Sequence, residues 1–403
     1  MDLSKTVRRD GLDTLERGQA RVIQDGDPET VGISRSRIGR VRAYLTHAVA
    51  EGAIPLADVV IVRKCVRLYQ ERIVHLSLLD RGHHVGADGR YYLGSFTKIF
   101  LATLIMQAVE RGDLMLSRPV GDYLPDFAAH GKQAVTIRHL LAHASGLPDQ
   151  LSFPMGTPVP VPEVLAEIYR QELVFPPGTR GSYCTWGFVV LAEVLRIATG
   201  REVADLGREW LFNPLGMRNT AFGCEPSEIP RIVPVFDADL TLHPWLNEPW
   251  CLLMMRGDTG AYSTAEDLAI FGQTMLNGGC YGEADILSPV SVAQMVTRQF
   301  PWADTPERLA GTGEEHFVTL SKGLGWMVRG EGFFRGSDLM SPRAFFHGGY
   351  PGMRVIVDPT YDLVSVFLTS IVATKPGLAP RIGKVGHVAH TFGTLAAAAI
   401  DRL

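Results

Sequence analysis

Hydrophobic positions recur with helical spacing near the start of the chain and with strand spacing just after it. Residues 34–54 carry one apolar stripe, which consists of Ile38, Val41, Tyr44, Leu45 and Ala48. This spacing predicts an amphipathic helix. Residues 57–76, "ADVVIVRKCVRLYQERIVHL", are rich in β-branched and aromatic side chains. They predict two consecutive strands.

The pattern changes in the middle of the chain and changes back near its end. From residue 95 to about residue 300 helical spacing dominates, and "GFVVLAEVLRIATG" and "TAEDLAIFGQTMLNGG" both end on glycine, as helices often do. The motif "STAED" is typical of a helix N-cap. Strand patterns return from about residue 321 in "KGLGWMVRG", "RAFFHGGYPG", "MRVIVDP" and "LVSVFLTS". The turn "DPTYD" predicts a hairpin between the last two, and a helix closes the chain.

This order of elements predicts an α+β fold, with one antiparallel sheet built from both chain ends, flanked by helices, and a mostly helical region inserted. We expect a lead-in over residues 1–30 and a sheet region formed by residues 31–94 and 318–403. The helical region then spans residues 95–317. An active site is expected at the junction of the two regions, because ligand sites favour such places.

Composition narrows the class of protein. The 403 residues are 46% hydrophobic and 20% charged, with a net charge of -4, so no strong field attracts nucleic acid or an anionic membrane. The N-terminus is polar, and the apolar stretch 99–106 is shorter than the ~20 residues that span a bilayer. Five widely spaced cysteines without C-x-x-C argue against a zinc site or a disulfide framework. We therefore expect a cytoplasmic protein without a membrane span.

One S-x-x-K motif, Ser95 and Lys98, opens the apolar segment in the middle of the chain. Residues three apart on a helix share a face, and the helix N-terminus favours negative charge, which suits an activated serine nucleophile. The alternative is an ordinary serine cap followed by a lysine whose stem covers the helix. Because nearly every neighbour is apolar, Lys98 is expected to be buried, and a buried lysine needs a reason.

Two further segments carry candidate chemistry. Tyr183 follows a Pro-Gly turn and could reach Ser95 as a proton acceptor, although a core tyrosine with an exposed hydroxyl is the alternative. His347, Gly348 and Gly349 interrupt a strand, and glycine in a strand indicates a close approach to the backbone. A substrate lying along this strand would explain the two glycines. A bulge or a tight turn is the alternative.

Other signals carry less weight. His139 and His143 have i, i+4 spacing but lack the Glu of H-E-x-x-H, so structural histidines are favoured over zinc ligands. The tripeptide 256–258, Arg-Gly-Asp, is interpreted as chance. The chain has no G-x-S-x-G motif and no phosphate loop. We therefore predict no cofactor and no metal.

The order of the motifs along the chain resembles that of the serine β-lactamase-like superfamily. These motifs are S-x-x-K, "TIRHLLAHASGLPD", "PGTRGSYCT", "LFNPLGMRNT", "STAEDLAIFGQTMLNGG" and "HGGYPGMRVIVDPTYDLVSVFLTS". The similarity is to its branch of class C β-lactamases, DD-peptidases, family VIII esterases and the lovastatin-type acyltransferase, and it covers roughly residues 28 to 400. It implies a β-lactamase/transpeptidase-like fold. It also implies that Ser95 is the acylated nucleophile, Lys98 its proton partner and Tyr183 the base and then the acid. The backbone N–H groups of Ser95 and Tyr350 would form the oxyanion hole.

The chain departs from the family pattern at two positions. Thr185 stands where the family has the Asn of Y-x-N, and His347 stands where it has the Lys of K-T-G. In lactamases these two groups hold the amide side chain and the carboxylate of the drug. A histidine with an ordinary pKa of ~6.5 is only about a quarter protonated at pH 7, so it cannot replace a permanent cation. Whether Lys98 or Tyr183 is the base stays open, because the two would titrate as a coupled pair.

These departures favour a carboxylesterase or acyltransferase that acts on a small ester, thioester or amide. A β-lactamase or DD-peptidase is the second interpretation, and the polar N-terminus argues against it. A non-catalytic scaffold or ligand sensor is the third, and the intact serine, lysine and tyrosine argue against it. The segments 150–172 and 234–258 are expected to line the pocket, and their aromatic and Met content favours an apolar acyl chain.

Overall fold

An eight-stranded sheet built from both ends of the chain forms the centre of the molecule. The computed structural model describes residues 21–80, 85–86, 88–154, 156–300, 321–330, 336–372 and 379–403. In spatial order the strands are β1 (Gln24–Asp25), β3 (Val66–Val74), β2 (Leu56–Arg63), β14 (Leu363–Leu368), β13 (Arg354–Asp358), β12 (Phe345–Gly348), β11 (Met327–Val328) and β10 (Ser321–Lys322). The two chain ends meet where β2 pairs with β14 in antiparallel register, with Val60 opposite Val366.

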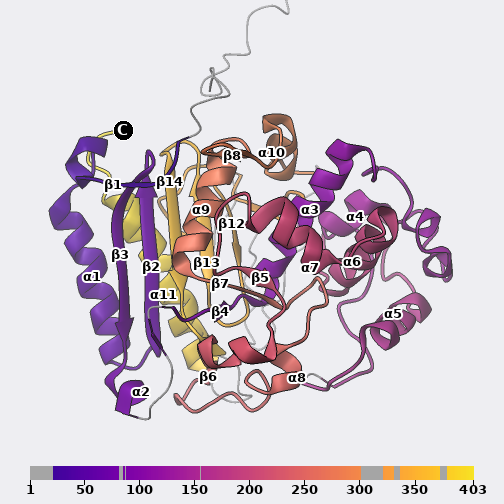
Figure 1. The fold of residues 1–403 in the computed structure, drawn as a ribbon, viewed down its shortest axis with the longest axis horizontal. Coiled ribbons are helices and arrows are strands. Elements are labelled where there is room, and N and C mark those ends of the chain that lie inside the picture. Colours follow the sequence, from indigo (N-terminus) through magenta and orange to yellow (C-terminus); the bar gives the residue numbers. More distant parts are fainter. Residues whose placement is uncertain are drawn as a thin grey trace, which may run out of the picture.

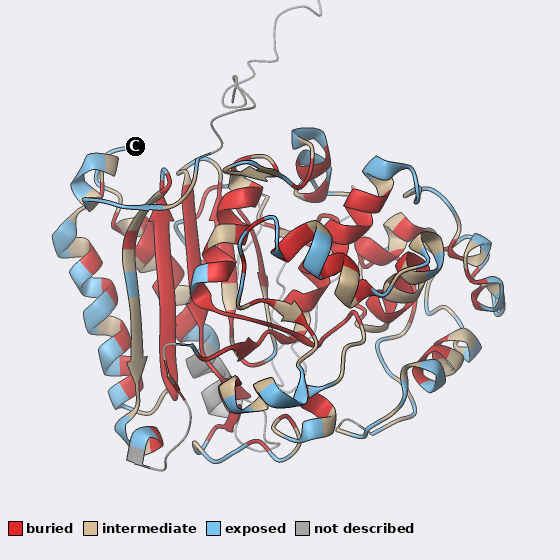
Figure 2. Cartoon of the chain, in the orientation of Figure 1, coloured by how far each residue is buried: buried red, intermediate tan, exposed pale blue. Residues whose placement is uncertain are grey.

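Helices cover both faces of this sheet. Helices α1 (Arg35–Ala50) and α11 (Ala379–Ala398) pack on one face, and α9 (Ala265–Leu276) packs on the other (Figure 1). All eight residues of β2 are buried, because Val59 and Ile61 face one core and Val60 and Val62 face the other (Figure 2). In a strand that is buried on both faces, apolar residues therefore occupy consecutive positions rather than alternate ones. The predicted α+β fold with its antiparallel sheet is confirmed.

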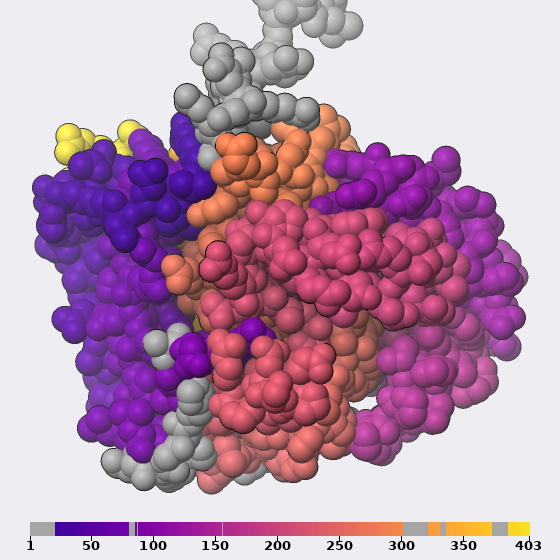
Figure 3. Space-filling model, viewed as in Figure 1, coloured from indigo at the N-terminus to yellow at the C-terminus, as the bar shows by residue number. Residues whose placement is uncertain are grey.

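Shorter elements fill the rest of the described chain, and segments from its middle spread across the front of the molecule (Figure 3). The helices are α2 (Leu76–Asp80), α3 (Thr97–Arg111), α4 (Ile137–Leu141), α5 (Val161–Arg170), α6 (Trp186–Thr199), α7 (Val203–Leu206), α8 (Pro249–Leu252) and α10 (Pro289–Met295). The strands outside the large sheet are β4 (Tyr91–Tyr92), β5 (Ala221–Phe222), β6 (Phe236–Asp237), β7 (Ala261–Ser263), β8 (Cys280–Tyr281), β9 (Ala284–Asp285) and β15 (Ile371–Val372).

Several local predictions hold in detail. Helix α6 ends at Gly200 in the left-handed conformation with φ 67°. Helix α9 begins at the N-cap Thr264, whose side chain accepts a hydrogen bond from the backbone N–H of Asp267. The residues before and after "DPTYD" pair as the hairpin β13–β14. Among the helices of the described ranges, none is both long enough and apolar enough to cross a bilayer.

Candidate active site

Ser95 lies in a tight turn just before α3 rather than inside that helix. Residues Gly94–Phe96 form a 3-10 turn, and α3 begins at Thr97. Gly94 has φ 51°, a conformation that glycine adopts without strain. The Thr97 hydroxyl donates to the Gly94 carbonyl (2.7 Å) and accepts from the Ala261 N–H (3.0 Å), so β7 holds the turn in place. Below we call Gly94–Phe96 the serine turn.

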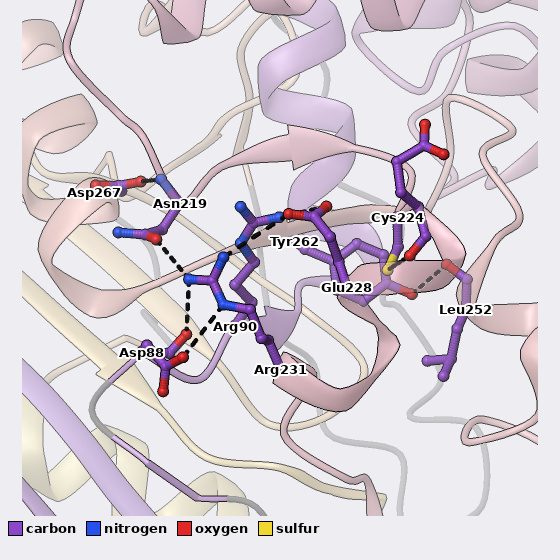
Figure 4. Close-up of polar contacts among 10 residues, drawn as sticks. Asp88, Arg90, Asn219, Cys224, Glu228, Arg231, Leu252, Tyr262 and Asp267 are labelled. Atoms are coloured by element: carbon purple, nitrogen blue, oxygen red, sulfur yellow. Dashed lines mark hydrogen bonds and ion pairs between the residues drawn. The ribbon is translucent and has the colours of Figure 1, made fainter.

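A polar network fixes the strand that leads into the serine turn (Figure 4). Arg90, just before β4, forms an ion pair with Glu228 at 2.9 Å. Arg231 donates to the Asn219 side-chain oxygen at 3.0 Å, and the Asn219 N–H donates to Asp267 on α9 at 2.8 Å. Three segments far apart in sequence are thereby joined next to β4. Such a scaffold keeps the candidate nucleophile in one position.

Lys98 is completely buried, as the apolar helix predicted. Its Nζ lies 3.1 Å from Ser95 Oγ and 2.9 Å from the backbone carbonyl oxygen of Asp258. The same nitrogen lies 5.4 Å from the ring centroid of Tyr183 and 5.9 Å from that of Phe188. Two hydrogen-bond acceptors and two aromatic rings therefore surround this amine, which is an environment that suits an ammonium ion.

The loop that supplies the Asp258 carbonyl ends the segment 234–258, which was expected to line the pocket, although its Arg-Gly-Asp tripeptide was interpreted as chance. Arg256 and Asp258 form a bidentate ion pair, with distances of 3.1 and 3.2 Å between their nitrogen and oxygen atoms. Gly257 has φ 89°, and a Cβ there would lie 2.5 Å from the Cβ of Ala192. The Arg-Gly-Asp tripeptide is therefore a compact, partly buried loop that aims a carbonyl at Lys98. No local signal could reveal this contact, because the two residues are 160 positions apart.

His143 positions Tyr183. The two rings stack with their centroids 4.4 Å apart and their planes at 24°. His143 has φ 54°, its Nδ1 accepts from the Cys184 N–H at 3.0 Å, and its carbonyl accepts from the Ser182 N–H at 2.8 Å. Both neighbours of Tyr183 are thus hydrogen-bonded to one histidine. The structural role that the sequence predicted for His143 is therefore to hold Tyr183 in place.

The two histidines of the i, i+4 pair have separate tasks. His139 lies inside α4 and completes a capping box with Thr136, whereas His143 lies beyond the last residue of that helix. Within the part of the chain that the structure describes, no group of three or more His, Cys, Asp or Glu side chains could hold a metal ion.

The glycines at the end of β12 pack against the serine turn. A Cβ at Gly349 would lie 2.0 Å from the backbone oxygen of Leu93, and a Cβ at Gly94 would lie 2.9 Å from the backbone nitrogen of Tyr350. The close approach predicted for this strand is therefore real, but at Gly349 it comes from the chain itself. Packing against Leu93 accounts for this glycine without a substrate, and the binding of a substrate along the strand stays a prediction. The packing brings the Tyr350 backbone nitrogen next to the serine turn.

Thr185 lies at the start of α6, where its backbone N–H donates to the Asp149 carboxylate at 2.6 Å. This contact brings Asp149 close to the candidate site, and the sequence interpretation did not single out that residue. The Asp149 carboxylate is thus fixed beside the position where the family has an asparagine amide.

The imidazole of His347 is neutral at pH 7. It is 1% exposed, and its Nδ1 donates to the Gly348 carbonyl at 2.7 Å. Burial, reinforced by the charge of Lys98, lowers the pKa of His347 to about 3. Burial and the charges of Lys322 and Lys98 also hold the pKa of His143 well below its usual value. Neither histidine can therefore supply a cation to the site.

We expect His347 to make the protein sensitive to acid. The unfolded chain binds a proton at this residue below its ordinary pKa of ~6.5, while the folded protein does not until about pH 3. The contribution of neutral His347 to the free energy of unfolding is therefore fully present above pH ~6.5. It decreases as the pH drops from there toward 3, and the loss is about 2 kcal/mol at pH 5. Unfolding free energies at pH 7 and pH 5 should differ less in His347→Gln than in the wild type.

The matched control for this experiment is His47→Gln, which removes an exposed histidine on α1. It should leave the pH dependence unchanged. An equal pH dependence in His347→Gln and the wild type would contradict the assignment.

Comparisons with known proteins show similarity in sequence and in fold. The profile of the family described as Beta-lactamase matches residues 41–387. A putative D-alanyl-D-alanine carboxypeptidase of Escherichia coli (strain K12) is 23% identical over 389 residues, which cover 87% of this chain and 86% of the relative. The structure of a family VIII carboxylesterase matches with a TM-score of 0.70 and 22% identity, covering 90% of this chain and 99% of that one. EstCE1, a hydrolase with promiscuous acyltransferase activity, matches with a TM-score of 0.68 and 20% identity, covering 88% and 99%.

Proposed function

Because the chain belongs to the Beta-lactamase family, we propose that it is a serine hydrolase that forms an acyl-enzyme on Ser95, with esterase or acyltransferase activity. The observation that carries this proposal is the position of Lys98 Nζ, which lies 3.1 Å from Ser95 Oγ in a fully buried site. A buried lysine that contacts a half-exposed serine fits an activated nucleophile better than a helix cap. The small-molecule substrate is an ester, a thioester or an amide.

Lys98 is proposed to remain protonated and Tyr183 to act as the base. Both hydrogen-bond partners of Lys98, the Ser95 hydroxyl and the Asp258 carbonyl, accept from an ammonium group. Lys98 Nζ lies 5.4 Å from the centroid of the Tyr183 ring, so the proposed base stands next to the amine that contacts Ser95. The phenolate takes the hydroxyl proton as Ser95 Oγ attacks the carbonyl carbon of the substrate.

The attack converts the substrate carbonyl oxygen into an oxyanion. We propose that the backbone N–H groups of Ser95 and Tyr350 stabilise it, since the packing of Gly94 places Tyr350 N beside the serine turn. When the intermediate collapses, the carbon–oxygen bond to the leaving group breaks and Tyr183 returns its proton to the leaving alcohol. Water or a second alcohol then attacks the acyl-Ser95 ester, again with Tyr183 as base, and Ser95 is regenerated.

The preference for esters over β-lactams rests on two groups. His347 is neutral, so it offers no permanent charge to a drug carboxylate where the family has lysine. Thr185 lacks the side-chain amide of the family's asparagine. A site that cannot pair the polar groups of a ligand discriminates strongly against it. The chemistry at Ser95 needs neither group.

The purified protein should therefore turn over p-nitrophenyl acetate with a kcat/KM at least about 10²-fold above that for nitrocefin. Added methanol tests acyl transfer, because a transferase forms methyl acetate at the expense of acetate. Comparable turnover of nitrocefin would contradict the preference for esters.

A second activity, D-alanyl-D-alanine carboxypeptidase, is favoured by the relative of that name from Escherichia coli. Release of D-alanine from a peptide that ends in D-Ala-D-Ala, measured beside the ester assay, decides between the two. A peptide rate above the ester rate would make the carboxypeptidase interpretation the better one.

A further inference from the structure

Lys322 brings a second ammonium group to Tyr183. Its Nζ lies 5.3 Å from the ring centroid of Tyr183, nearly the same distance as that of Lys98. Lys322 is 7% exposed, so its side chain is largely withdrawn from water. The sequence interpretation did not single out this residue, which lies in "KGLGW" far from the other motifs.

The backbone around Lys322 is held in place from two sides. Lys322 pairs with Met327 on β11, and its carbonyl accepts a hydrogen bond from the Gln299 N–H at 3.0 Å. The next residue, Gly323, packs so closely that a Cβ would lie 2.1 Å from the backbone oxygen of Met295. The position of the ammonium group is therefore set by the edge of the large sheet and by the end of α10.

Lys322 approaches Tyr183 from a different strand than the one that carries His347. His347 lies on β12 and is neutral at pH 7, whereas Lys322 lies on β10, two strands further along the sheet. The charges of both lysines act on the imidazoles of His143 and His347, and His143 stacks on the Tyr183 ring. Among the described residues, the same region also holds the Asp149 carboxylate, which accepts from the Thr185 N–H, and the ion pair Arg256–Asp258.

We propose that Lys322 is a positioning residue for Tyr183, which holds the ring and stabilises its phenolate form together with Lys98. This inference rests on the proposed function only in that Tyr183 accepts the Ser95 proton. Two cations near one ring favour the phenolate more than one cation does. In this chain the second cation comes from β10 instead of the K-T-G strand.

Lys322→Met tests the proposal, with Lys322→Arg as the conservative variant and Lys64→Met, an exposed lysine in the β2–β3 turn, as the control for loss of charge. We expect Lys322→Met to lower kcat for p-nitrophenyl acetate about 10- to 100-fold with little change in KM. The acidic limb of its pH profile should move to higher pH. Lys322→Arg should recover part of both effects, and Lys64→Met should match the wild type.

A second ester, p-nitrophenyl hemisuccinate, distinguishes a positioning role from direct binding of an anionic substrate. Equal losses on the neutral and the anionic ester support the proposal. A loss confined to the anionic ester and expressed in KM would overturn it, because Lys322 would then bind substrate. Unchanged kinetics and pH profile in a folded Lys322→Met would also overturn it.

An optical titration separates failure of this inference from failure of the proposed function. The tyrosinate absorbance of Tyr183 is obtained as the difference between the wild type and Tyr183→Phe, and it needs no substrate. The half-titration pH should be higher in the Lys322→Met background than in the native one. A higher half-titration pH in Lys322→Met without any ester turnover by the wild type would support the role of Lys322 and refute the esterase function. Ester turnover with an unchanged half-titration pH would support the esterase function and refute the role of Lys322.

Discussion

Ser95→Ala should eliminate covalent labelling by a fluorophosphonate and lower ester kcat/KM by about 10⁴-fold or more. Lys98 Nζ lies 3.1 Å from a hydroxyl that the variant no longer has, so the proposed proton transfer has no nucleophile to act on. Intact mass spectrometry of the treated proteins checks the labelling directly. The wild type should gain the mass of one probe, and the variant should gain none.

The control is Ser36→Ala, which removes an exposed hydroxyl on α1 and should label and turn over as the wild type does. An adduct on Ser95→Ala would identify a different nucleophile. No adduct on any of the three proteins would mean that the lysine and the tyrosine do not activate this serine. The interpretation of the chain as a scaffold or ligand sensor would then become the better one.

Gly349→Ala should reduce both stability and activity, although it adds a single methyl group to a residue without reactive atoms. The new Cβ would lie 2.0 Å from the Leu93 carbonyl oxygen and 2.9 Å from the Met353 side chain. Relief requires the end of β12 to move away from the serine turn, at a cost of about 3 kcal/mol in unfolding free energy. Tyr350 would move with it, and a displacement of ~1 Å at an oxyanion donor lowers kcat by about 10²-fold.

Gly39→Ala is the control, because it makes the same change from glycine to alanine but is expected to raise the unfolding free energy rather than lower it. Gly39 lies inside α1, and a Cβ there would meet nothing within 4 Å. Alanine in a helix interior is favoured over glycine by about 1 kcal/mol, so the control should be slightly more stable and fully active. Chemical denaturation and ester kinetics on both variants provide the comparison. Wild-type stability in Gly349→Ala would refute the close packing at the serine turn.

The local features of this fold could be predicted from the sequence. The helices α1, α6 and α9, the strands β2 and β3 and the hairpin β13–β14 follow from hydrophobic period, capping residues and turn chemistry. The Ser95–Lys98 contact also follows from the spacing of three residues, although Ser95 lies in the 3-10 turn before α3 rather than in the helix itself. Each of these features is decided by interactions within a few residues.

The features that depend on contacts between distant segments could not be predicted. The Asp258 carbonyl and Lys322 reach the site from loops and edges whose place is set by the whole sheet. The 3-10 turn before α3 results from the bond between Thr97 and β7, which a helical pattern does not reveal. A pattern of glycines predicted a close approach at β12 but not the identity of the approaching backbone, which is Leu93.

The pairing of β2 with β14 also constrains how the protein folds. These strands are some 300 residues apart in the chain, and the edge formed by β10–β12 depends on the strands that come after it. Contacts between such distant segments carry a large loop-closure cost and slow the folding of a domain. On a ribosome, Ser95 and Lys98 would emerge long before His347 and Tyr350. The candidate nucleophile is thus synthesised early, and the proposed second oxyanion donor, Tyr350, follows about 250 residues later. Chains that stop between the two should therefore carry no acyl-transfer activity.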